Sequence, residues 1–371
     1  MKQLITKDRL FKLHSWVGVN LSILLFVVCF SGTLAVFSHE LDWLFNPAMR
    51  AQPSDEQASW NTIAANVQAA FPEGRITYWH RAHEPYLTDL IYVKQGDDLK
   101  YVFANPYTGA VQGSADITIA RFMRDLHYYL FIPFQIGHFT VLFFGFVLTI
   151  ALWTGLLYYR DWYKKLFVLK TGKGAKVFYS SLHKLIGAWS IPFLMVISLT
   201  ALWYFVERAD FPRISSYLDE ARPTVQAPSG VEQPLSYPAI DYDQYAAIAK
   251  QAIPGLSVKG IYPPFTSTQS LYLTGPSEVP LVRYRANRVY VDPYTHQVLK
   301  VQQADQINTV TWLNDIADPV HFGYWGGLAS KTVWFIFGLG LSILILTGPW
   351  LFLKKQKKLR KLKKERRVVY G

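Results

Sequence analysis

The chain has 371 residues, a formal net charge of +12 and a single cysteine, and 51% of its residues are hydrophobic. A small soluble domain is excluded, because the apolar residues are concentrated in four segments that each reach the ~20 residues needed to cross a bilayer. Disulfides and thiolate metal sites are also excluded, since Cys29 is alone and lies within the first of these segments.

The predicted elements divide the chain into nine segments. The four apolar ones are expected to be transmembrane helices: residues 16–37, 138–159, 184–206 and 332–353. The connections 38–137 and 207–331 are long enough to fold as domains, whereas 160–183 is only a loop. Residues 1–15 precede the first helix, and the basic tail 354–371 follows the last one.

Lysine and arginine are distributed unevenly among these segments. Residues 160–185 hold seven basic residues and one acidic residue, and the tail sequence "KKQKKLRKLKKERR" holds ten and one. The long connections hold 7 basic and 11 acidic residues (40–127) and 10 basic and 12 acidic residues (206–331). Because short cytoplasmic segments accumulate Lys and Arg, both termini are predicted to be cytoplasmic and both long connections external. The positive charge thus reports topology, with the lipid bilayer and not nucleic acid as the expected partner.

The two halves of the chain resemble each other. The phrases "LHSWVG" (13–18) and "LHKLIG" (182–187) begin two apolar segments at a constant offset of 169 residues. The long connections share a turn phrase after a strand-like run, "NPYTGAV" at 105 and "DPYTHQV" at 292. Each half therefore reads as a helix, a helix-and-hairpin domain and a helix. Since each half begins and ends inside, an internal duplication with same-orientation repeats is predicted, related by an axis along the membrane normal.

The duplication sorts four histidines into two equivalent pairs. His14 and His183 lie at the cytoplasmic ends of their helices, while His127 and His321 lie at the external approach to the other two. A single histidine at a helix end is more often an interfacial anchor, but a titratable residue at membrane depth is a functional hypothesis by default. Two matched pairs favour metal binding, since two neutral imidazoles that face each other can ligate one metal.

Haem suits a pair of histidines better than a bare ion does. Zinc requires four ligands, and neither His14 nor His183 has another His, Asp or Glu at helical spacing. Haem supplies four equatorial nitrogens and leaves two axial positions. Nearby glycines would allow a porphyrin to approach: Gly18, Gly187, Gly326 and Gly327. One haem is therefore expected at each pair.

The remaining histidines are weaker candidates. His138 is the alternative to His127, as a substitute ligand or a proton handle, but the equivalent position in the fourth helix is Ser330 or Lys331. His39 is expected to be interfacial and His296 to lie in a turn. His80 and His83 form an H-x-x-H spacing, which is weak evidence for a metal, and a solvated surface is the preferred interpretation.

Taken together, these phrases resemble the PepSY-associated membrane family. The resemblance rests on the Leu-His starts, "LHYYLFIP" at 126, "HFGYWGG" at 321, the Thr-Gly pairs at 154 and 347, and "HELDWLFNP" after the first helix. Ala201 departs from the Thr-Gly pattern in the third helix. Members are bacterial inner-membrane proteins with periplasmic PepSY-type domains. The resemblance implies an α-helical membrane protein with four transmembrane helices plus two periplasmic α+β PepSY-like domains, residues 38–137 and 207–331.

Some members of this family are di-haem ferric-siderophore reductases. The resemblance therefore implies two b-type haems on His14, His183, His127 and His321, with no catalytic residue assigned. The expected acceptor is a ferric siderophore or another periplasmic Fe(III) complex, since hard oxygen ligands hold Fe³⁺ more firmly than Fe²⁺. No dinucleotide fingerprint is visible in the sequence, so the electron donor is expected to be a separate cytoplasmic protein or a quinol.

Two other functions are kept as alternatives. A non-redox PepSY scaffold, accessory to iron uptake or peptidase regulation, would use the same histidines as helix-end anchors and would lack haem absorbance. Proton or metal transport is less favoured, because no predicted span carries a central Asp, Glu, Lys or Arg.

An arginine-rich phrase, "RYRANR", lies in the second long connection. Arg283 and Arg285 are expected on one face of a strand, with Arg288 beyond a turn. A solvated sheet edge is the simpler interpretation, since basic residues there prevent edge pairing. The functional alternative is a docking patch for an anionic acceptor or a lipid headgroup.

Overall fold

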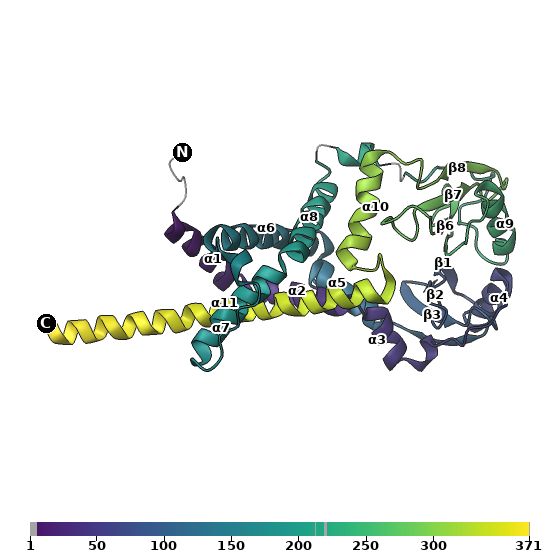
Figure 1. Cartoon of the computed structure of the whole chain (residues 1–371). Coiled ribbons are helices and arrows are strands. Elements are labelled where there is room, and N and C mark those ends of the chain that lie inside the picture. Colours follow the sequence, from purple (N-terminus) through teal and green to yellow (C-terminus); the bar gives the residue numbers. More distant parts are fainter. Residues whose placement is uncertain (1–5, 212, 219–220, 371) are drawn as a thin grey trace. The chain divides into compact units, whose positions relative to one another are not determined.

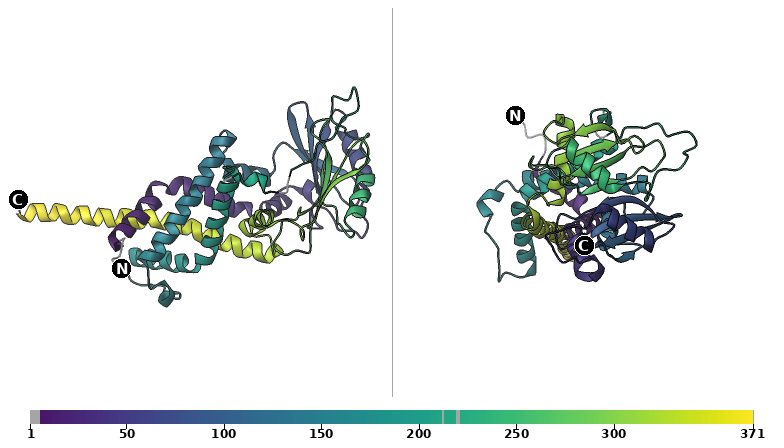
Figure 2. Two further views of the ribbon diagram at one scale, coloured as in Figure 1. Left: turned by 90° about the horizontal axis from the view of Figure 1, so that it is seen from above. Right: turned by 90° about the vertical axis from the view of Figure 1, so that its right-hand side faces the viewer.

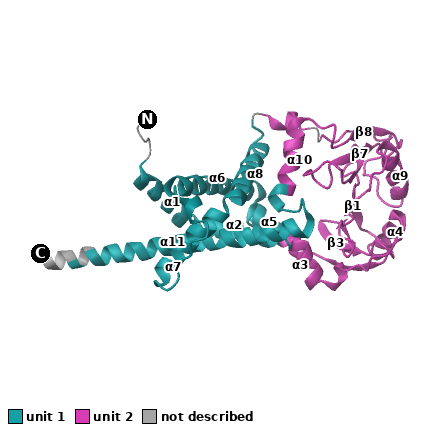
Figure 3. Ribbon diagram, viewed as in Figure 1, with its two compact units in different colours: residues 1–37, 123–211, 320–371 teal, residues 38–122, 212–319 magenta. Residues whose placement is uncertain are grey.

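The computed structural model describes residues 6–211, 213–218 and 221–370, and for the last turns of the final helix it describes backbone but few side chains. The chain forms two compact units (Figure 1, Figure 3). Unit 1 comprises residues 1–37, 123–211 and 320–371, and unit 2 comprises residues 38–122 and 212–319. Helices α5 (Ile119–Tyr129) and α10 (Thr309–Phe322) pass from unit 2 into unit 1.

Unit 1 is helical. Its helices are α1 (Lys7–Asn20), α2 (Ser22–Ala35), α6 (Phe134–Tyr158), α7 (Ala175–Trp189), α8 (Ile191–Arg208) and α11 (Gly327–Tyr370), with a short 3-10 turn η2 (Trp162–Lys165). Among the described residues, three helices are long and apolar enough to cross a membrane, namely α6, α8 and the first part of α11. A fourth span results if α1 and α2 are counted together, since the pair passes the same test across a bend of 70°.

The first and third predicted spans are broken helices. Residues 16–37 do not form one straight helix, because α1 ends at Asn20 and α2 begins at Ser22. The third span breaks at Ser190, where Pro192 in the first turn of α8 cannot donate a backbone hydrogen bond to the preceding turn. Neither break is visible in hydropathy, which averages over both sides of it.

The two parts of each broken span pack mainly against different helices. Helix α1 packs against α6 while α2 packs against α11, and α7 packs against α11 while α8 packs against α6. Small residues permit the close approaches, as at other membrane helix crossings. A Cβ atom on Gly145 would lie 2.8 Å from the Cβ atom of Ala201, and one on Gly338 would lie 2.5 Å from Oγ1 of Thr33. The bends thus bring segments from both halves of the chain together.

Unit 2 contains one antiparallel sheet of eight strands. The strands are β1 (Arg75–His80), β2 (Asp89–Gln95), β3 (Asp98–Ala104), β4 (Val111–Ala115), β5 (Gly260–Tyr262), β6 (Leu271–Gly275), β7 (Asn287–Val291) and β8 (Val298–Gln302). Their order in the sheet is β4-β3-β2-β1-β5-β6-β7-β8. The other elements are α3 (Ser38–Phe45), η1 (Pro47–Met49), α4 (Trp60–Ala70), η3 (Ile214–Ser216) and α9 (Tyr242–Ala252).

The two long connections, predicted as separate domains, share this sheet. Strand β1 pairs with β5 through Trp79↔Ile261 and His80↔Gly260, so strands from the two connections lie side by side (Figure 2). Pairing between the first strands removes one exposed edge from each half, which is energetically favourable because unpaired edge groups otherwise need another partner. Each half contributes four strands to the sheet, β1–β4 with α4 and β5–β8 with α9.

One face of the sheet forms the core with α4 and α9. Alternate strand residues point to this face, including Trp79, which is fully buried with its ring centre 4.9 Å from that of Trp60 and 5.7 Å from that of Tyr242. Edge-to-face ring pairs of this kind add about 0.5–1.5 kcal/mol each beyond burial. The helices also cap each other, since Asp243 of α9 accepts the backbone N–H groups of Trp60 and Asn61 at the start of α4.

The predicted hairpin turns are confirmed in both halves. The carboxamide oxygen of Asn105 accepts the backbone N–H groups of Tyr107 and Thr108, and the carboxylate of Asp292 accepts those of Tyr294 and Thr295. His296 lies in the second turn with a positive φ of 61°, the position that Gly109 occupies in the first with φ 78°.

Candidate functional site

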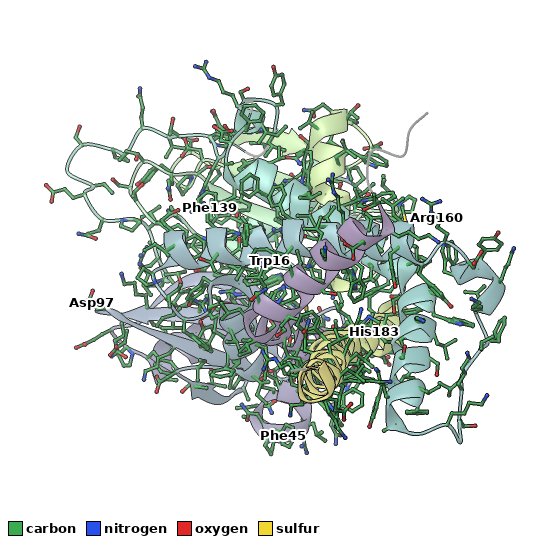
Figure 4. All side chains as sticks on the ribbon, turned by 90° about the vertical axis from the view of Figure 1, so that its left-hand side faces the viewer. Trp16, Phe45, Asp97, Phe139, Arg160 and His183 are labelled. Atoms are coloured by element: carbon green, nitrogen blue, oxygen red, sulfur yellow. The ribbon has the colours of Figure 1, made fainter. Side chains whose placement is uncertain are left out.

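The first histidine pair consists of His14 on α1 and His183 on α7, which come from the first and second halves of the chain. The centres of the two imidazole rings lie 6.4 Å apart, and the ring planes make an angle of 84°. Figure 4 labels His183 and shows it beside α11, the helix that supplies its hydrogen-bond partner. The two histidines are 169 residues apart in the sequence, but their rings are close enough for one atom between them to contact both.

The second pair consists of His127 on α5 and His321 on α10. Its ring centres lie 6.3 Å apart with an angle of 47° between the ring planes. The ring centres of Tyr204 and Phe322 lie 5.3 Å and 5.6 Å from that of His321, so aromatic side chains flank this histidine. Both pairs expected from the sequence are therefore adjacent in space, with almost the same separation.

The rings of the first pair are oriented by oxygen atoms on helices α6 and α11. Nδ1 of His183 lies 2.8 Å from Oγ1 of Thr347 on α11, and Nδ1 of His14 lies 3.0 Å from the carbonyl oxygen of Ala151 on α6 and 3.3 Å from Oγ1 of Thr154. Each threonine donates its own hydroxyl proton to a carbonyl one turn earlier. The hydroxyl oxygens therefore accept, and the proton of each imidazole resides on Nδ1.

The second pair is held by the same chemistry on the other two helices. Nδ1 of His321 lies 2.7 Å from Oγ1 of Thr200 on α8, which donates to the carbonyl of Val196. Nδ1 of His127 lies 2.8 Å from the carbonyl oxygen of Val28 on α2. In all four histidines the Nδ1–H group donates, which leaves the lone pair on Nε2. Within the described part of the chain, no group hydrogen-bonds to these Nε2 atoms.

A hydroxyl residue followed by a small residue recurs at each contact. The four dipeptides are Ser31-Gly32, Thr154-Gly155, Thr200-Ala201 and Thr347-Gly348. The glycines leave room for the rings, since a Cβ atom on Gly32 would lie 2.6 Å from Cε1 of His127, and Cβ atoms on Gly155 and Gly348 would lie 3.3 Å and 3.6 Å from Cε1 of His14 and His183. The Thr-Gly pairs at 154 and 347 are visible in the sequence, but their contacts with His14 and His183 depend on which helices are neighbours.

The separation within each pair fits two ligands of one metal. With a metal–nitrogen bond of about 2.0 Å and a ring nitrogen about 1.1 Å from the ring centre, two imidazoles on opposite sides of one metal have centres about 6.2 Å apart. Each pair offers two protein ligands, the number of axial positions that haem leaves open. In the described residues, no group of three or more His, Cys, Asp or Glu side chains gathers as a metal site.

His138, the alternative to His127, lies on α6 and is 4% exposed. Its ring centre is 4.1 Å from that of Tyr128 and 5.2 Å from that of Phe134, and its Nδ1 atom is buried without a hydrogen-bond partner among the described residues. The imidazole neighbour of His127 is His321 rather than His138. The geometry favours His127, and a substitute role of His138 stays a prediction.

His80 and His83 of unit 2 are half-buried, whereas the sequence favoured a solvated surface. The ring of His80 stacks on Tyr78 with an angle of 10° between the planes, and the ring centre of His83 lies 3.9 Å from that of Tyr284. Their own ring centres are 6.2 Å apart. The simple H-x-x-H spacing gave no sign of burial, because the covering residue Tyr284 comes from the other half of the chain.

Burial of these two histidines predicts a loss of stability in acid. Burial lowers the pKa of His80 to about 3 and the pKa of His83 to about 4. Between these values and pH 6.5 only the unfolded chain binds the protons, so stability falls with falling pH by about 1.4 kcal/mol per pH unit for each histidine. The variant His80→Gln is expected to flatten the pH dependence between pH 6 and pH 4, as measured by denaturant unfolding. Parallel curves for the variant and the wild type would contradict this result.

A helical unit with membrane-length spans and an antiparallel sheet unit together define a membrane protein with a large extramembrane domain. Within this class, the chain belongs to the PepSY-associated TM region family, whose family model matches residues 11–355. The match covers all four histidines of the two pairs, and it confirms the family predicted from the sequence. No curated protein sequence matches the chain.

Proposed function

We propose that the protein is a di-haem b electron-transfer protein of the bacterial inner membrane that reduces ferric siderophores in the periplasm. His14 and His183 would hold one haem, and His127 and His321 the other. The observation that carries this proposal is the repeated geometry of the two pairs, with ring centres 6.4 Å and 6.3 Å apart and every Nδ1–H group engaged by a neighbouring helix.

The residues around each pair support ligation of a haem iron. A bound haem supplies one-electron chemistry, because its iron alternates between Fe(III) and Fe(II). The threonine and carbonyl acceptors fix the imidazole tautomer and ring direction, and they increase the basicity of Nε2. All four imidazoles are half-buried among the helices. These histidines would hold the haem iron through Nε2, with their rings already oriented by the neighbouring helices.

The positions of the histidines along the spans give the direction of electron flow that we propose. Charge asymmetry supports cytoplasmic termini and a periplasmic unit 2. The two halves would be same-orientation repeats, which agrees with the matched positions of α1 and α7, α5 and α10, and the two four-stranded halves of the sheet. His14 and His183 would then face a cytoplasmic or quinol donor, and His127 and His321 a periplasmic Fe(III) acceptor.

The test uses spheroplasts, a membrane-impermeant ferric siderophore and a ferrous-iron trap in the medium. Wild type is expected to release Fe²⁺ outside, whereas His183→Ala is expected to abolish release driven by cytoplasmic donors. The control His296→Ala changes a hairpin turn of unit 2 and is expected to behave as wild type. If the wild type keeps two fully reducible haems and yields no external Fe²⁺, siderophore reduction is the wrong function.

The threonine acceptors predict a shift in redox potential. Thr347→Val removes the hydrogen-bond acceptor of Nδ1 of His183. The imidazole then donates less charge to Fe(III), so the midpoint potential of that haem is expected to rise by on the order of 50 mV. Thr154→Val is expected to have a smaller effect, because the carbonyl of Ala151 still accepts from His14. Equal shifts in a potentiometric titration would contradict this explanation.

A further inference from the structure

Unit 2 contains a cavity of about 210 Å³ on the sheet face opposite the α4 and α9 core. It is lined by Arg222, Tyr272, Thr274, Arg285, Arg288 and Tyr290. Its floor is made by two cross-strand pairs of β6 and β7, namely Tyr272↔Tyr290 and Thr274↔Arg288. Side chains two residues apart on a strand share a face, so these four are presented together while Leu271, Leu273, Val289 and Val291 enter the core.

Arg222 is fixed at this cavity by the backbone. Its guanidinium donates to the carbonyl oxygens of Tyr262, Pro263 and Ser270, and its Cζ atom lies 4.9 Å from the centre of the Tyr272 ring. Carbonyl oxygens carry no net charge, so they hold the group in place without neutralising it. A positioned guanidinium loses little side-chain entropy when an anion binds.

Arg285 and Arg288 are positioned by α10 and by the turn before β7, which corrects the strand expected for the "RYRANR" phrase. Arg288 is 6% exposed, lies on β7 and has its Nη2 atom 4.0 Å from Oδ1 of Asp315, while Arg283 is buried in ion pairs with Asp315 and Asp318. Arg285 lies 3.7 Å from the carboxylate of Asp318, and half of its side chain is exposed. Of the lining residues that the structure describes, three carry guanidinium groups and none carries a carboxylate.

The corresponding positions in the first half of the sheet lack these arginines. Counted from the equivalent turn residues Asn105 and Asp292, the corresponding pairs of β2 and β3 are Leu90↔Phe103 and Tyr92↔Tyr101. Tyrosine rings recur along this face of the sheet, with neighbouring ring centres 4.1 to 5.1 Å apart across six strands. The arginines occur in one half only. A packing requirement of the sheet would place them in both halves, whereas a binding site needs them in only one.

Guanidinium groups match the planar geometry of carboxylates, and the tyrosine rings supply apolar walls. A volume of about 210 Å³ is below the range for drug-sized ligands, and therefore suits part of a larger molecule. We propose that this cavity binds the carboxylate groups of an anionic Fe(III) chelate of the citrate type. This inference rests on the proposed function, and it specifies the chemical class of the acceptor.

The test measures binding of Ga(III) citrate to the full-length protein in detergent by isothermal titration calorimetry. Ga³⁺ resembles Fe³⁺ in its ligands but is not reduced, so the signal reports binding alone. Arg285→Gln is expected to weaken binding at least about tenfold, and Arg222→Gln is a second variant. The matched control is Arg50→Gln, since Arg50 likewise donates to carbonyl oxygens, those of Trp43 and Leu44, and lies over the Trp43 ring.

Three results would overturn the site: no binding, unchanged affinity in a folded Arg285→Gln protein, or equal affinity for an uncharged Ga(III) trihydroxamate. Equal affinity for metal-free citrate would show that the cavity binds a simple carboxylate and would contradict recognition of a metal chelate. Periplasmic Fe(III) reduction without Ga(III) citrate binding would refute this site and leave the proposed function standing. Ga(III) citrate binding without periplasmic Fe(III) reduction would refute the proposed function and leave this site standing. The two failures are therefore distinguishable.

Discussion

His14→Ala and His183→Ala are each expected to lower the haem content of the purified protein from two to one, and both variants should lose the same haem. The reason is geometric, because the two rings lie 6.4 Å apart and would share a single iron. A bis-histidine haem that loses one axial ligand is no longer low-spin and is held much less firmly. The double variant should therefore lose no more haem than either single variant.

The measurement is pyridine haemochrome quantification together with a redox titration, which identifies the retained haem by its midpoint potential. His138→Ala is the informative control, because this residue is buried near Tyr128 yet is assigned no iron. It should retain both haems. Loss of different haems in His14→Ala and His183→Ala would show that the pairing is wrong, and loss of a haem in His138→Ala would restore that residue as a ligand.

Gly32→Ala is expected to disrupt the second pair. A Cβ atom there would lie 2.6 Å from Cε1 and 2.7 Å from Nδ1 of His127, distances that real Cβ contacts do not reach. The ring must move, which breaks its hydrogen bond to the Val28 carbonyl and its alignment with His321. The haem on this pair should therefore be lost or become high-spin.

The other glycines provide a graded comparison for this prediction. Gly155→Ala, with a Cβ contact of 3.3 Å to His14, should perturb the first pair mildly, and Gly348→Ala, with 3.6 Å to His183, should leave it nearly unchanged. Low-spin haem absorbance and haem content provide the readout. A Gly32→Ala protein with an unaltered spectrum would mean that the ring of His127 is not confined as described.

Sequence alone located the histidines because the two halves of the chain share phrases around them. His14 and His183 share a Leu-His start, and the repeat predicted that they would meet. The supporting Thr-Gly pairs were visible too, but their role depended on which helices are neighbours. That neighbourhood follows from helix breaks at Leu21 and Ser190, and hydropathy does not detect a break when both sides of it are apolar.

Long-range pairing was the other feature beyond the sequence. The joint sheet depends on two residue pairs between β1 and β5, which lie about half the chain apart, and no local propensity encodes them. The second half of the chain also partly covers His83, through Tyr284. Arg283 was expected on an exposed strand face because its carboxylate partners, Asp315 and Asp318, lie on a helix some 30 residues later. Local sequence patterns therefore predicted which helices and strands form. Which side chains are buried depended on long-range contacts that these patterns do not encode.

The most direct test of the central claim is the visible spectrum and pyridine haemochrome content of the detergent-purified wild-type protein. Two b-type haems per chain are predicted, both low-spin in the oxidised and reduced states, since each pair provides two oriented imidazoles. A protein that is well folded, expressed with sufficient haem supply and purified without Soret absorbance would contradict the account. It would leave the four histidines as helix-end anchors of a non-redox PepSY scaffold.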